Sequence, residues 1–253
     1  METYISSVAR ASSLDDGVYY PDTDGQPMAN NTEHFERIAT TKYGLESVFR
    51  GRDDVFVAAD LFWYPVKDKP NIAVAPDVMV VFGRPKGERK SYIQWREDNV
   101  APQVVFEFLS EANTAAEMAR KAAFFERYGV QEYYIYDLNR KELSGLLRYD
   151  EQGDALEEIP DMRNWKSPRL GVRFDMSSGD LQIYKPDDTP FLQFSALEDL
   201  VRMQTAELKQ TAEKIEQISE RLERAEVAIS KSESRAEALA AKLRALGVDP
   251  DAA

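Results

Sequence analysis

The stretch Val104–Ser110, VVFEFLS, constrains the fold of this chain most, because it reads as a β-strand that is apolar on both faces. Side chains alternate between the two faces of a strand. One face carries Val104, Phe106 and Phe108, and the other carries Val105, Glu107 and Leu109. We therefore expect a buried strand with a carboxylate in its middle. A buried carboxylate is costly unless a cation or hydrogen-bond donors lie beside it.

The sequence around this strand predicts a mixed α/β domain. Helices are predicted from Asn31-Thr32 to about residue 50, with Phe35, Ile38, Leu45 and Phe49 along it, and from the capping box Thr114–Glu117 to about residue 128, where Gly129 ends it. Strands are predicted at 55–64, 77–82, 104–110 and 132–136, with shorter ones within 146–149, 172–174 and 181–184. Strand, helix and strand between 104 and 136 indicate a right-handed parallel crossover, and the remaining strands indicate antiparallel hairpins.

The residue types present limit which metal sites the chain can build. The 253 residues include no cysteine and a single histidine, His34, which excludes disulfides, thiolate sites and a multi-histidine zinc site within one chain. A metal site must therefore consist mainly of carboxylates, which suit magnesium, manganese or calcium.

The charge balance and the lengths of the apolar runs indicate which partners and which cellular location to expect. The net charge of −13 argues against non-specific binding to nucleic acid, although it allows a local basic site. The start, METYISSVAR, has no apolar core of a signal peptide, and no run reaches the roughly 18 apolar residues of a membrane span. We expect a soluble cytoplasmic protein with no membrane partner.

The composition changes near residue 195, which divides the chain into domains at 1–195 and 196–253. After that point a heptad repeat runs through Val201, Leu208, Ile215, Leu222, Ile229, Ala236 and Leu243, while the positions three residues later are half polar: Gln204, Thr211, Ile218, Ala225, Ser232, Leu239 and Leu246. The pattern predicts a long helix that forms a coiled coil with another copy or with a partner, and Gly247 as its C-cap. We expect a homodimer, while the half-polar second column leaves a trimer open. The alternative is a long helix packed on its own domain.

Asp77, Glu107 and Lys121 come from neighbouring predicted elements and could converge. Lys121 borders the apolar stripe of its helix, so it can reach the strand of Glu107. Two carboxylates can hold a hard divalent cation, which activates water for attack on a phosphoryl group, and a lysine can stabilise the developing charge. Taken singly, Asp77 could cap a turn, Glu107 could bond to the backbone or to Lys121, and Lys121 could pair with Glu117 on the surface.

The segments APDVMVVFG, APQVVFEFLS and YGVQEYYIYD, with Lys121 on the helix between the last two, resemble the bacterial Uma-type restriction endonuclease family of the PD-(D/E)xK nuclease superfamily. The resemblance covers about residues 18–150. It implies a restriction-endonuclease-like core, a mixed sheet flanked by helices, with the site on its strands. Pro76-Asp77 matches the first acidic motif and Glu107 the second.

The resemblance departs from the superfamily pattern at the lysine. The usual position, two residues after the glutamate, is Leu109 here, and Lys121 matches a position that this family places on the following helix. Glu117 matches an acidic position one turn earlier, and Tyr133-Tyr134 stands where the family often has Tyr-Trp.

Some superfamily members use a further acid from the first helix, for which Glu33, Glu36 and Glu46 are all open candidates, whereas we expect His34 to be structural or exposed. The segment GRPKGERKSY is the clearest basic island, and its Arg84, Lys86, Arg89 and Lys90 are candidate phosphate-binding residues. The alternative for this island is an exposed, solubilising loop.

These observations predict an endonuclease that hydrolyses DNA with Mg²⁺ or Mn²⁺, using Asp77 and Glu107 as metal ligands and Lys121 as the third catalytic residue. A dimer would place two sites on one duplex. A second hypothesis is a non-catalytic adaptor, for nucleic acid or a protein partner, that retains the nuclease fold and works through its coiled coil. A third is a metal-dependent hydrolase of RNA or a small phosphoester.

Overall fold

The computed structural model describes residues 14–23, 29, 31–150, 153 and 155–247, and the chain divides into two compact units, Met1–Gln193 and Phe194–Ala253. The helices of the first unit are α2 (Thr32–Val48), the 3-10 helix η1 (Gln94–Arg96) and α3 (Ala115–Arg127). Its strands are β1 (Leu14–Asp15), β2 (Val18–Tyr19), β3 (Val55–Ala59), β4 (Trp63–Tyr64), β5 (Val78–Phe82), β6 (Tyr92–Ile93), β7 (Val104–Leu109), β8 (Glu132–Asp137), β9 (Glu142–Leu147), β10 (Glu157–Glu158), β11 (Arg173–Asp175) and β12 (Gln182–Tyr184). The second unit contains α4 (Phe194–Ala245).

Six strands form one mixed sheet in the order β10-β9-β8-β7-β5-β3. β7 and β8 run parallel, in register from Val104 opposite Glu132 to Leu109 opposite Asp137, and α3 connects them. The other neighbouring strands of this sheet are antiparallel. The predicted α/β class, with a mixed sheet and a parallel crossover, is therefore confirmed.

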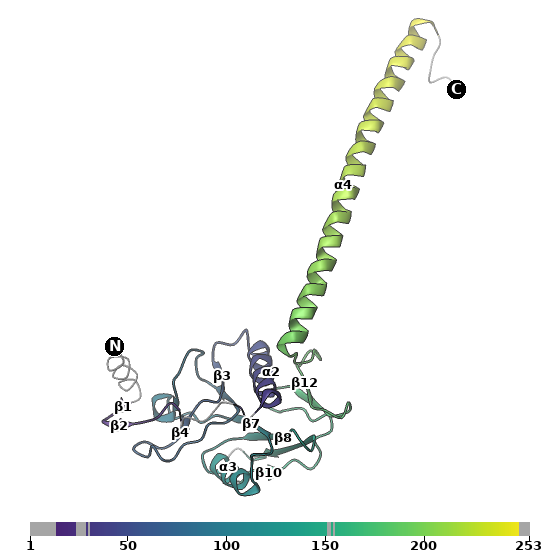
Figure 1. Cartoon of the computed structure of the whole chain (residues 1–253). Helices are drawn as coiled ribbons and strands as arrows, with labels where there is room; N and C mark the ends of the chain where they lie inside the picture. Colours follow the sequence, from purple (N-terminus) through teal and green to yellow (C-terminus); the bar gives the residue numbers. More distant parts are fainter. Residues whose placement is uncertain (1–13, 24–28, 30, 151–152, 154, 248–253) are drawn as a thin grey trace, which may run out of the picture. The chain divides into compact units, whose positions relative to one another are not determined.

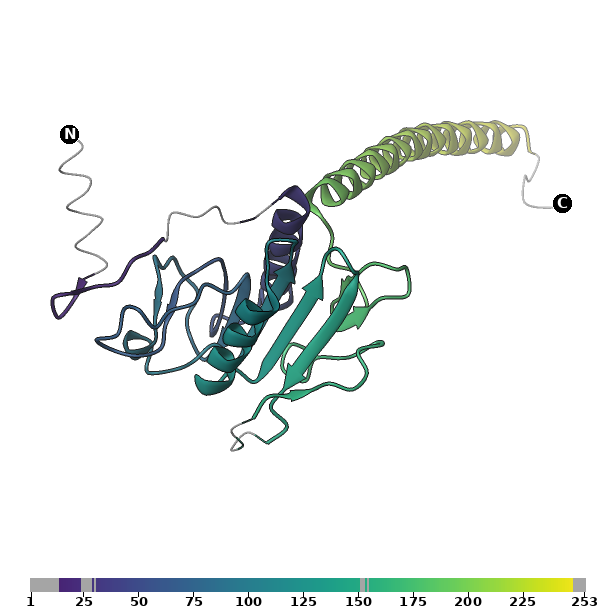
Figure 2. The same ribbon diagram turned by 60° about the horizontal axis from the view of Figure 1, so that its bottom comes forward.

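Both faces of β7 are buried, each under its own helix. Phe106 packs in one core with Ile38 and Leu45 of α2, whereas Val105 packs in a second core with Phe125 of α3. The two helices lie on opposite sides of β7 and β8 (Figure 1), and the turned view shows α3, in teal, lying along the strands (Figure 2). A strand that is apolar on both faces needs such cover on both sides, which is why VVFEFLS occupies the interior of the sheet.

Local signals fix the ends of the two covering helices. The Asn31 side chain accepts a hydrogen bond from His34 N at 2.8 Å and caps α2, and Thr114 Oγ1 accepts one from Glu117 N at 3.2 Å and caps α3. Gly129 follows α3 with a φ of +93°, a left-handed conformation that favours glycine. The predicted N-caps and the end at Gly129 are thus confirmed. In the described part of the chain, however, the Glu117 side chain contacts Asn113 and does not complete the capping box with the Thr114 backbone.

Three sequence predictions differ from the structure in detail. The stretch 55–64 forms β3 and β4 instead of one strand, because Asp60 adopts a φ of +47° and breaks the extended chain. Phe35 is 50% exposed, since the buried face of α2 passes through His34, Ile38, Thr41 and Leu45 and leaves Phe35 one position off that stripe. β9 begins at Glu142, before the predicted stretch 146–149.

One close approach ties α2 to the segment after β12. A Cβ added at Gly44 would fall on the Phe191 ring, which is itself buried, so only a glycine leaves room for this contact. No helix in the described residues has the length and apolarity that a membrane crossing requires.

Candidate active site

Glu107, in the middle of β7, is held by Lys121 of α3. The Glu107 side chain is 2% exposed, and its Oε2 accepts a hydrogen bond from Lys121 Nζ at 2.7 Å. The second oxygen, Oε1, is buried and has no hydrogen-bond partner among the described residues. Lys121 reaches this carboxylate because α3 covers the sheet face that carries Glu107. The ammonium therefore compensates one oxygen of the buried carboxylate and leaves the other for a ligand.

Asp77 lies at the entrance to β5 and is fixed from two other elements. Its Oδ2 accepts a hydrogen bond from Phe108 N at 2.7 Å and lies 3.0 Å from Nε2 of the buried His34. Nε2 donates this hydrogen bond in the tautomer that carries the ring proton on Nε2. For Oδ1 the structure records no partner within the described residues. Asp77 thus presents one fixed and one available oxygen.

The three residues predicted from the sequence, Asp77, Glu107 and Lys121, line one pocket of about 340 Å³. Its other lining residues are Ala29, His34, Asp60, Phe62, Ala73, Val74, Ala75, Phe108, Asn113 and Glu117. The Glu117 side chain lies 3.4 Å from Asn113 Nδ2, at the start of α3. The convergence is therefore observed, while the chemical roles remain predictions.

Electrostatics in the pocket are dominated by burial. Burial raises the pKa of Glu107 to about 8 and the charge of Asp77 adds to the rise, whereas Lys121 opposes it. Burial also acts to lower the pKa of Lys121, but the attraction of Glu107 outweighs it and the net direction is upward. The two shifts are compatible, because Lys121 loses its proton only above its ordinary range, where Glu107 is already ionised.

The exposure of the two side chains agrees with both directions. Lys121 keeps 20% of its side chain exposed and is surrounded by carboxylates, whereas Glu107 is almost fully removed from solvent. The ammonium can therefore keep its proton, and Glu107 is the group that titrates near neutral pH. A second positive charge at the free oxygen would favour its ionised form.

The donor set fits a hard divalent cation of the kind that the sequence predicts. Among the described residues, no three His, Asp or Glu side chains group closely enough to surround a metal by themselves. Magnesium, however, usually keeps several water ligands and binds proteins through one or two carboxylates. The buried Oε1 of Glu107 lacks the partner that such a cation would supply. Asp77 and Glu107 are the residues that would hold it.

The candidate acids of the first helix lie elsewhere. Glu33 pairs with Lys141 at 2.5 Å on the surface, Glu36 is exposed, and Glu46 pairs with Lys42 at 2.9 Å. The contribution of α2 to the pocket is His34, which was expected to be structural or exposed. His34 is buried and contacts Asp77.

Sequence reasoning also missed Asp60 and Asn113 as lining residues of the pocket. Asp60 had one signal, a charged residue that interrupts a long apolar run. His34 had none, because its contact with Asp77 spans 43 positions and depends on how α2 crosses the sheet.

The basic island is largely neutralised from within the first unit. Arg84 and Arg89 both pair with Glu97, at 3.1 and 2.7 Å, and Lys86 Nζ donates to the carbonyl oxygens of Phe49 and Arg50. Lys90 is exposed, and no side-chain partner is recorded for it in the described part of the chain. Of the four candidate phosphate-binding residues, it alone presents an uncommitted charge.

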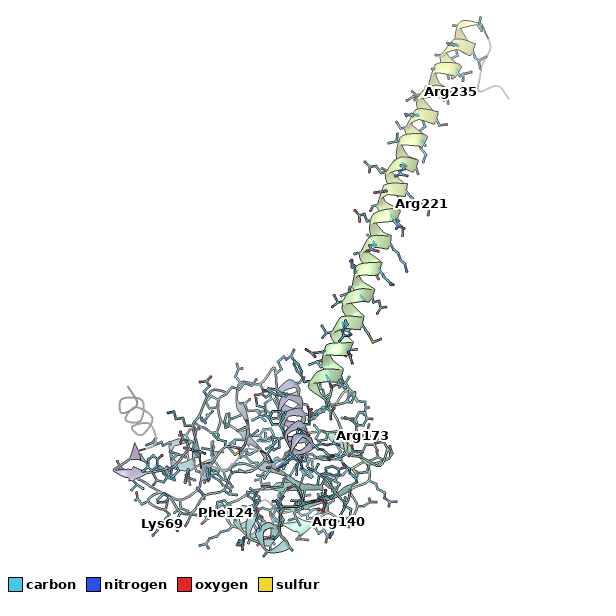
Figure 3. All side chains as sticks on the ribbon, viewed as in Figure 1. Lys69, Phe124, Arg140, Arg173, Arg221 and Arg235 are labelled. Atoms are coloured by element: carbon cyan, nitrogen blue, oxygen red, sulfur yellow. The ribbon has the colours of Figure 1, made fainter. Side chains whose placement is uncertain are left out.

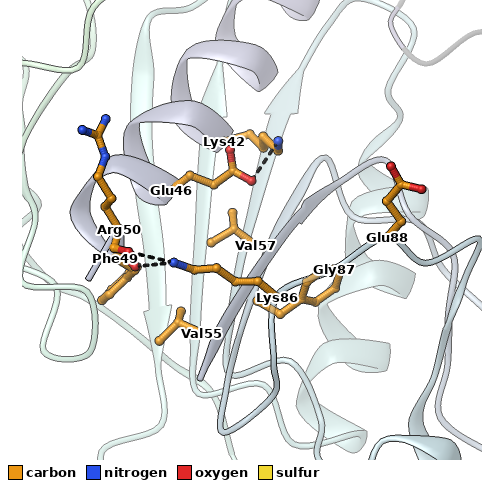
Figure 4. Close-up of a pocket in the computed structure, with 10 residues that line it drawn as sticks. Lys42, Glu46, Phe49, Arg50, Val55, Val57, Lys86, Gly87 and Glu88 are labelled. Atoms are coloured by element: carbon orange, nitrogen blue, oxygen red, sulfur yellow. Dashed lines mark hydrogen bonds and ion pairs between the residues drawn. The ribbon is translucent and has the colours of Figure 1, made fainter. Parts of the chain in front are cut away.

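A second cavity, of about 430 Å³, lies at the other end of α2 and shares no lining residue with the pocket of Asp77. Figure 4 shows Lys86 pointing across it towards the carbonyl groups that end α2, with the Lys42–Glu46 pair above. Lys86 therefore caps the helix terminus, where a cation is favoured, and Glu46 belongs to this cavity.

The fold and the site define an α/β domain with a mixed sheet and a buried carboxylate–lysine cluster formed by β7, α3 and the entrance to β5. The family model Uma2, described as "Putative restriction endonuclease", matches residues 15–188, and the chain belongs to this family. Among solved structures, one described as a "putative nuclease belonging to DUF820" from Anabaena variabilis is 15% identical with a TM-score of 0.42, covering 62% of this chain and 81% of that one. No curated protein was found to match.

Proposed function

We propose that this protein is a divalent-metal-dependent endonuclease that hydrolyses phosphodiester bonds of DNA. The observation that carries the proposal is the buried, unpartnered Oε1 of Glu107 in a pocket shared with Asp77 and Lys121. Membership of the Uma2 family supports the same reading. A merely structural glutamate would have both oxygens satisfied, as Glu132 has on the neighbouring strand through Ser167, Tyr134 and the Arg169 backbone.

Five residues of the pocket then have a defined task. Asp77 and Glu107 would hold Mg²⁺ or Mn²⁺, and the chemistry that the bound cation supplies is polarisation of a phosphoryl oxygen and activation of water. His34 Nε2 and Phe108 N fix Oδ2 of Asp77, which orients its second oxygen. Lys121 uses one of its three N–H donors on Glu107, so the others can contact a phosphate oxygen and stabilise charge in the transition state.

Nicking of supercoiled plasmid in Mg²⁺ or Mn²⁺ tests the proposal. Wild type is compared with Glu107→Gln, which keeps the volume of the side chain and an oxygen that can accept from Lys121. We expect wild type to nick and the variant to lose activity by on the order of 100-fold or more. Binding of Mn²⁺, measured calorimetrically on the same preparations, should weaken in the variant.

Glu132→Gln is the matched control, because Glu132 is equally buried on the adjacent strand and does not line the pocket. It should nick like wild type once the fraction of folded protein is taken from circular dichroism. Equal nicking by wild type and Glu107→Gln would reject the assignment of Glu107.

Mn²⁺ binding without any cleavage of duplex DNA, single-stranded DNA or RNA would reject the nuclease and leave the adaptor and the hydrolase of a small phosphoester. The adaptor hypothesis has one specific observation in its favour, the 52-residue α4, in which no residue is buried.

A further inference from the structure

α4 is 52 residues long, and none of its residues is buried. Its side chains stand away from the helix along its whole length, as Figure 3 shows around Arg221 and Arg235. Large apolar residues are among them, and they recur every seven positions. Between 54% and 70% of the surface is exposed at Val201, Leu208, Ile215, Leu222 and Ile229. A continuous apolar stripe on an exposed helix marks an association surface.

Internal contacts do not account for the stability of this helix. The ion pairs recorded within α4, a helix that lies wholly in the described part of the chain, are Arg202–Asp199 and Arg224–Glu220. Such pairs contribute little, and helical stability in proteins comes mainly from packing of an apolar face. The repeat also exceeds the three to four heptads that mark a coiled coil. A helical partner for the stripe follows.

We propose that this partner is α4 of a second copy, aligned parallel and in register. The seam consists of the heptad positions that begin at Val201 and recur every seven residues to Leu243, together with the positions three residues after each of them, from Gln204 to Leu246. In a parallel, in-register pair each residue of the seam meets its own counterpart. The polar Gln204, Thr211 and Ser232 then meet Gln204, Thr211 and Ser232, and their hydrogen-bonding groups can satisfy one another.

An antiparallel pairing of the same stripe matches polar with apolar residues across the seam. With Leu222 opposite Ala225, Gln204 of one copy meets Leu243 of the other, and Ser232 meets Ile215. Each such layer buries a polar group against an apolar one, which costs free energy without a compensating hydrogen bond.

Charges beside the seam favour the same orientation. In the parallel pair, Arg221 lies across from Glu226 of the second copy, and like charges do not meet across the seam. In the antiparallel pair, Lys214 lies across from Arg235 and Glu207 lies across from Lys242, so one repulsive contact offsets the attractive one. Flanking charges of this kind select the orientation of paired helices. Polar layers and flanking charges thus agree on a parallel dimer, independently of whether the first unit is a nuclease.

A disulfide test on the full chain reads the orientation directly, because the protein has no cysteine of its own. Ser232→Cys places one thiol in the seam, and Ser230→Cys places one on the outer face of the same turn. Under mild oxidation we expect Ser232→Cys to cross-link nearly completely and Ser230→Cys to stay uncrosslinked. In the antiparallel pair the two Ser232 positions lie 17 residues apart along the helix axis, or about 25 Å, beyond the reach of a disulfide.

Light scattering supplies the second readout, with an expected mass of twice the 28.8 kDa chain. Ile218→Glu, in the seam, should weaken the dimer by on the order of 100-fold or more, since it buries a charge. Val227→Glu, equally apolar and 51% exposed but outside the seam, should leave the dimer intact. A monomeric wild type, a trimer, or cross-linking through Ser230 as fast as through Ser232 would overturn the proposal.

Discussion

Replacing Lys121 with Met tests whether Glu107 is held as a buried carboxylate whose counter-ion is this lysine. The substitution keeps the aliphatic stem but removes the ammonium that donates to Glu107 Oε2 at 2.7 Å. The partly exposed i,i+4 pair Lys42–Glu46, 2.9 Å apart, offers Lys42→Met as a matched control. Both changes break one ion pair, and only the first leaves a buried partner.

The expected loss of stability depends on pH, because the pKa of Glu107 is raised by burial to about 8. A carboxyl group whose pKa is raised on folding contributes stability below the unfolded pKa of about 4.3, and this contribution is lost as the pH rises towards the folded value. At pH 5.5 Glu107 is neutral with or without Lys121, so the variant loses about one hydrogen bond, roughly 1 kcal/mol.

At pH 9 the wild type contains the ion pair, and the variant must bury an unpaired carboxylate or keep its proton. Breaking a buried pair from one side costs about 3–5 kcal/mol. For a unit of this size that corresponds to a fall in Tm of roughly 6–20 °C, against about 2–4 °C at pH 5.5. Lys42→Met should change stability by less than about 0.5 kcal/mol at either pH.

Thermal unfolding followed by circular dichroism in EDTA, at both pH values, provides the measurement without any contribution from metal. A loss for Lys121→Met as small as that for Lys42→Met at pH 9 would refute the buried pair. A large loss already at pH 5.5 would refute the raised pKa, because Glu107 would then be ionised in acid.

Three further predictions concern packing, metal and DNA. Gly44→Ala should reduce the free energy of unfolding by about 1–3 kcal/mol, and so lower Tm by several degrees, because its Cβ meets the Phe191 ring. Gly51 has open space around it, so Gly51→Ala should leave Tm unchanged. Differential scanning calorimetry compares the two variants. The affinity for Mn²⁺ should rise with pH up to about 8 and then level off, because the cation competes with the proton on Glu107. Titration calorimetry measures this rise, and Glu107→Gln should abolish it. Lys90→Ala should reduce the salt dependence of DNA binding by about one unit of slope. Arg89→Ala should instead lower Tm, because Arg89 pairs with Glu97.

Local sequence signals determined the elements that carry the site. The alternation in VVFEFLS predicted a strand buried on both faces, and the Thr114 cap with Gly129 predicted the helix that covers one of them. Both signals act over a few residues, through side-chain direction, hydrogen bonding to free N–H groups and backbone conformation. They were sufficient to bring Glu107 and Lys121 together, because a short parallel crossover must return over its own strand.

Only the tertiary structure decided which distant residues complete the pocket and which charges are already used. His34 reaches Asp77 across 43 positions, and Glu97 takes up both Arg84 and Arg89. Neither contact follows from periodicity or spacing, since both depend on how α2 crosses the sheet and how the loop around η1 folds back. A pattern specifies the face on which a side chain lies, but the packing of non-adjacent elements decides what that face meets.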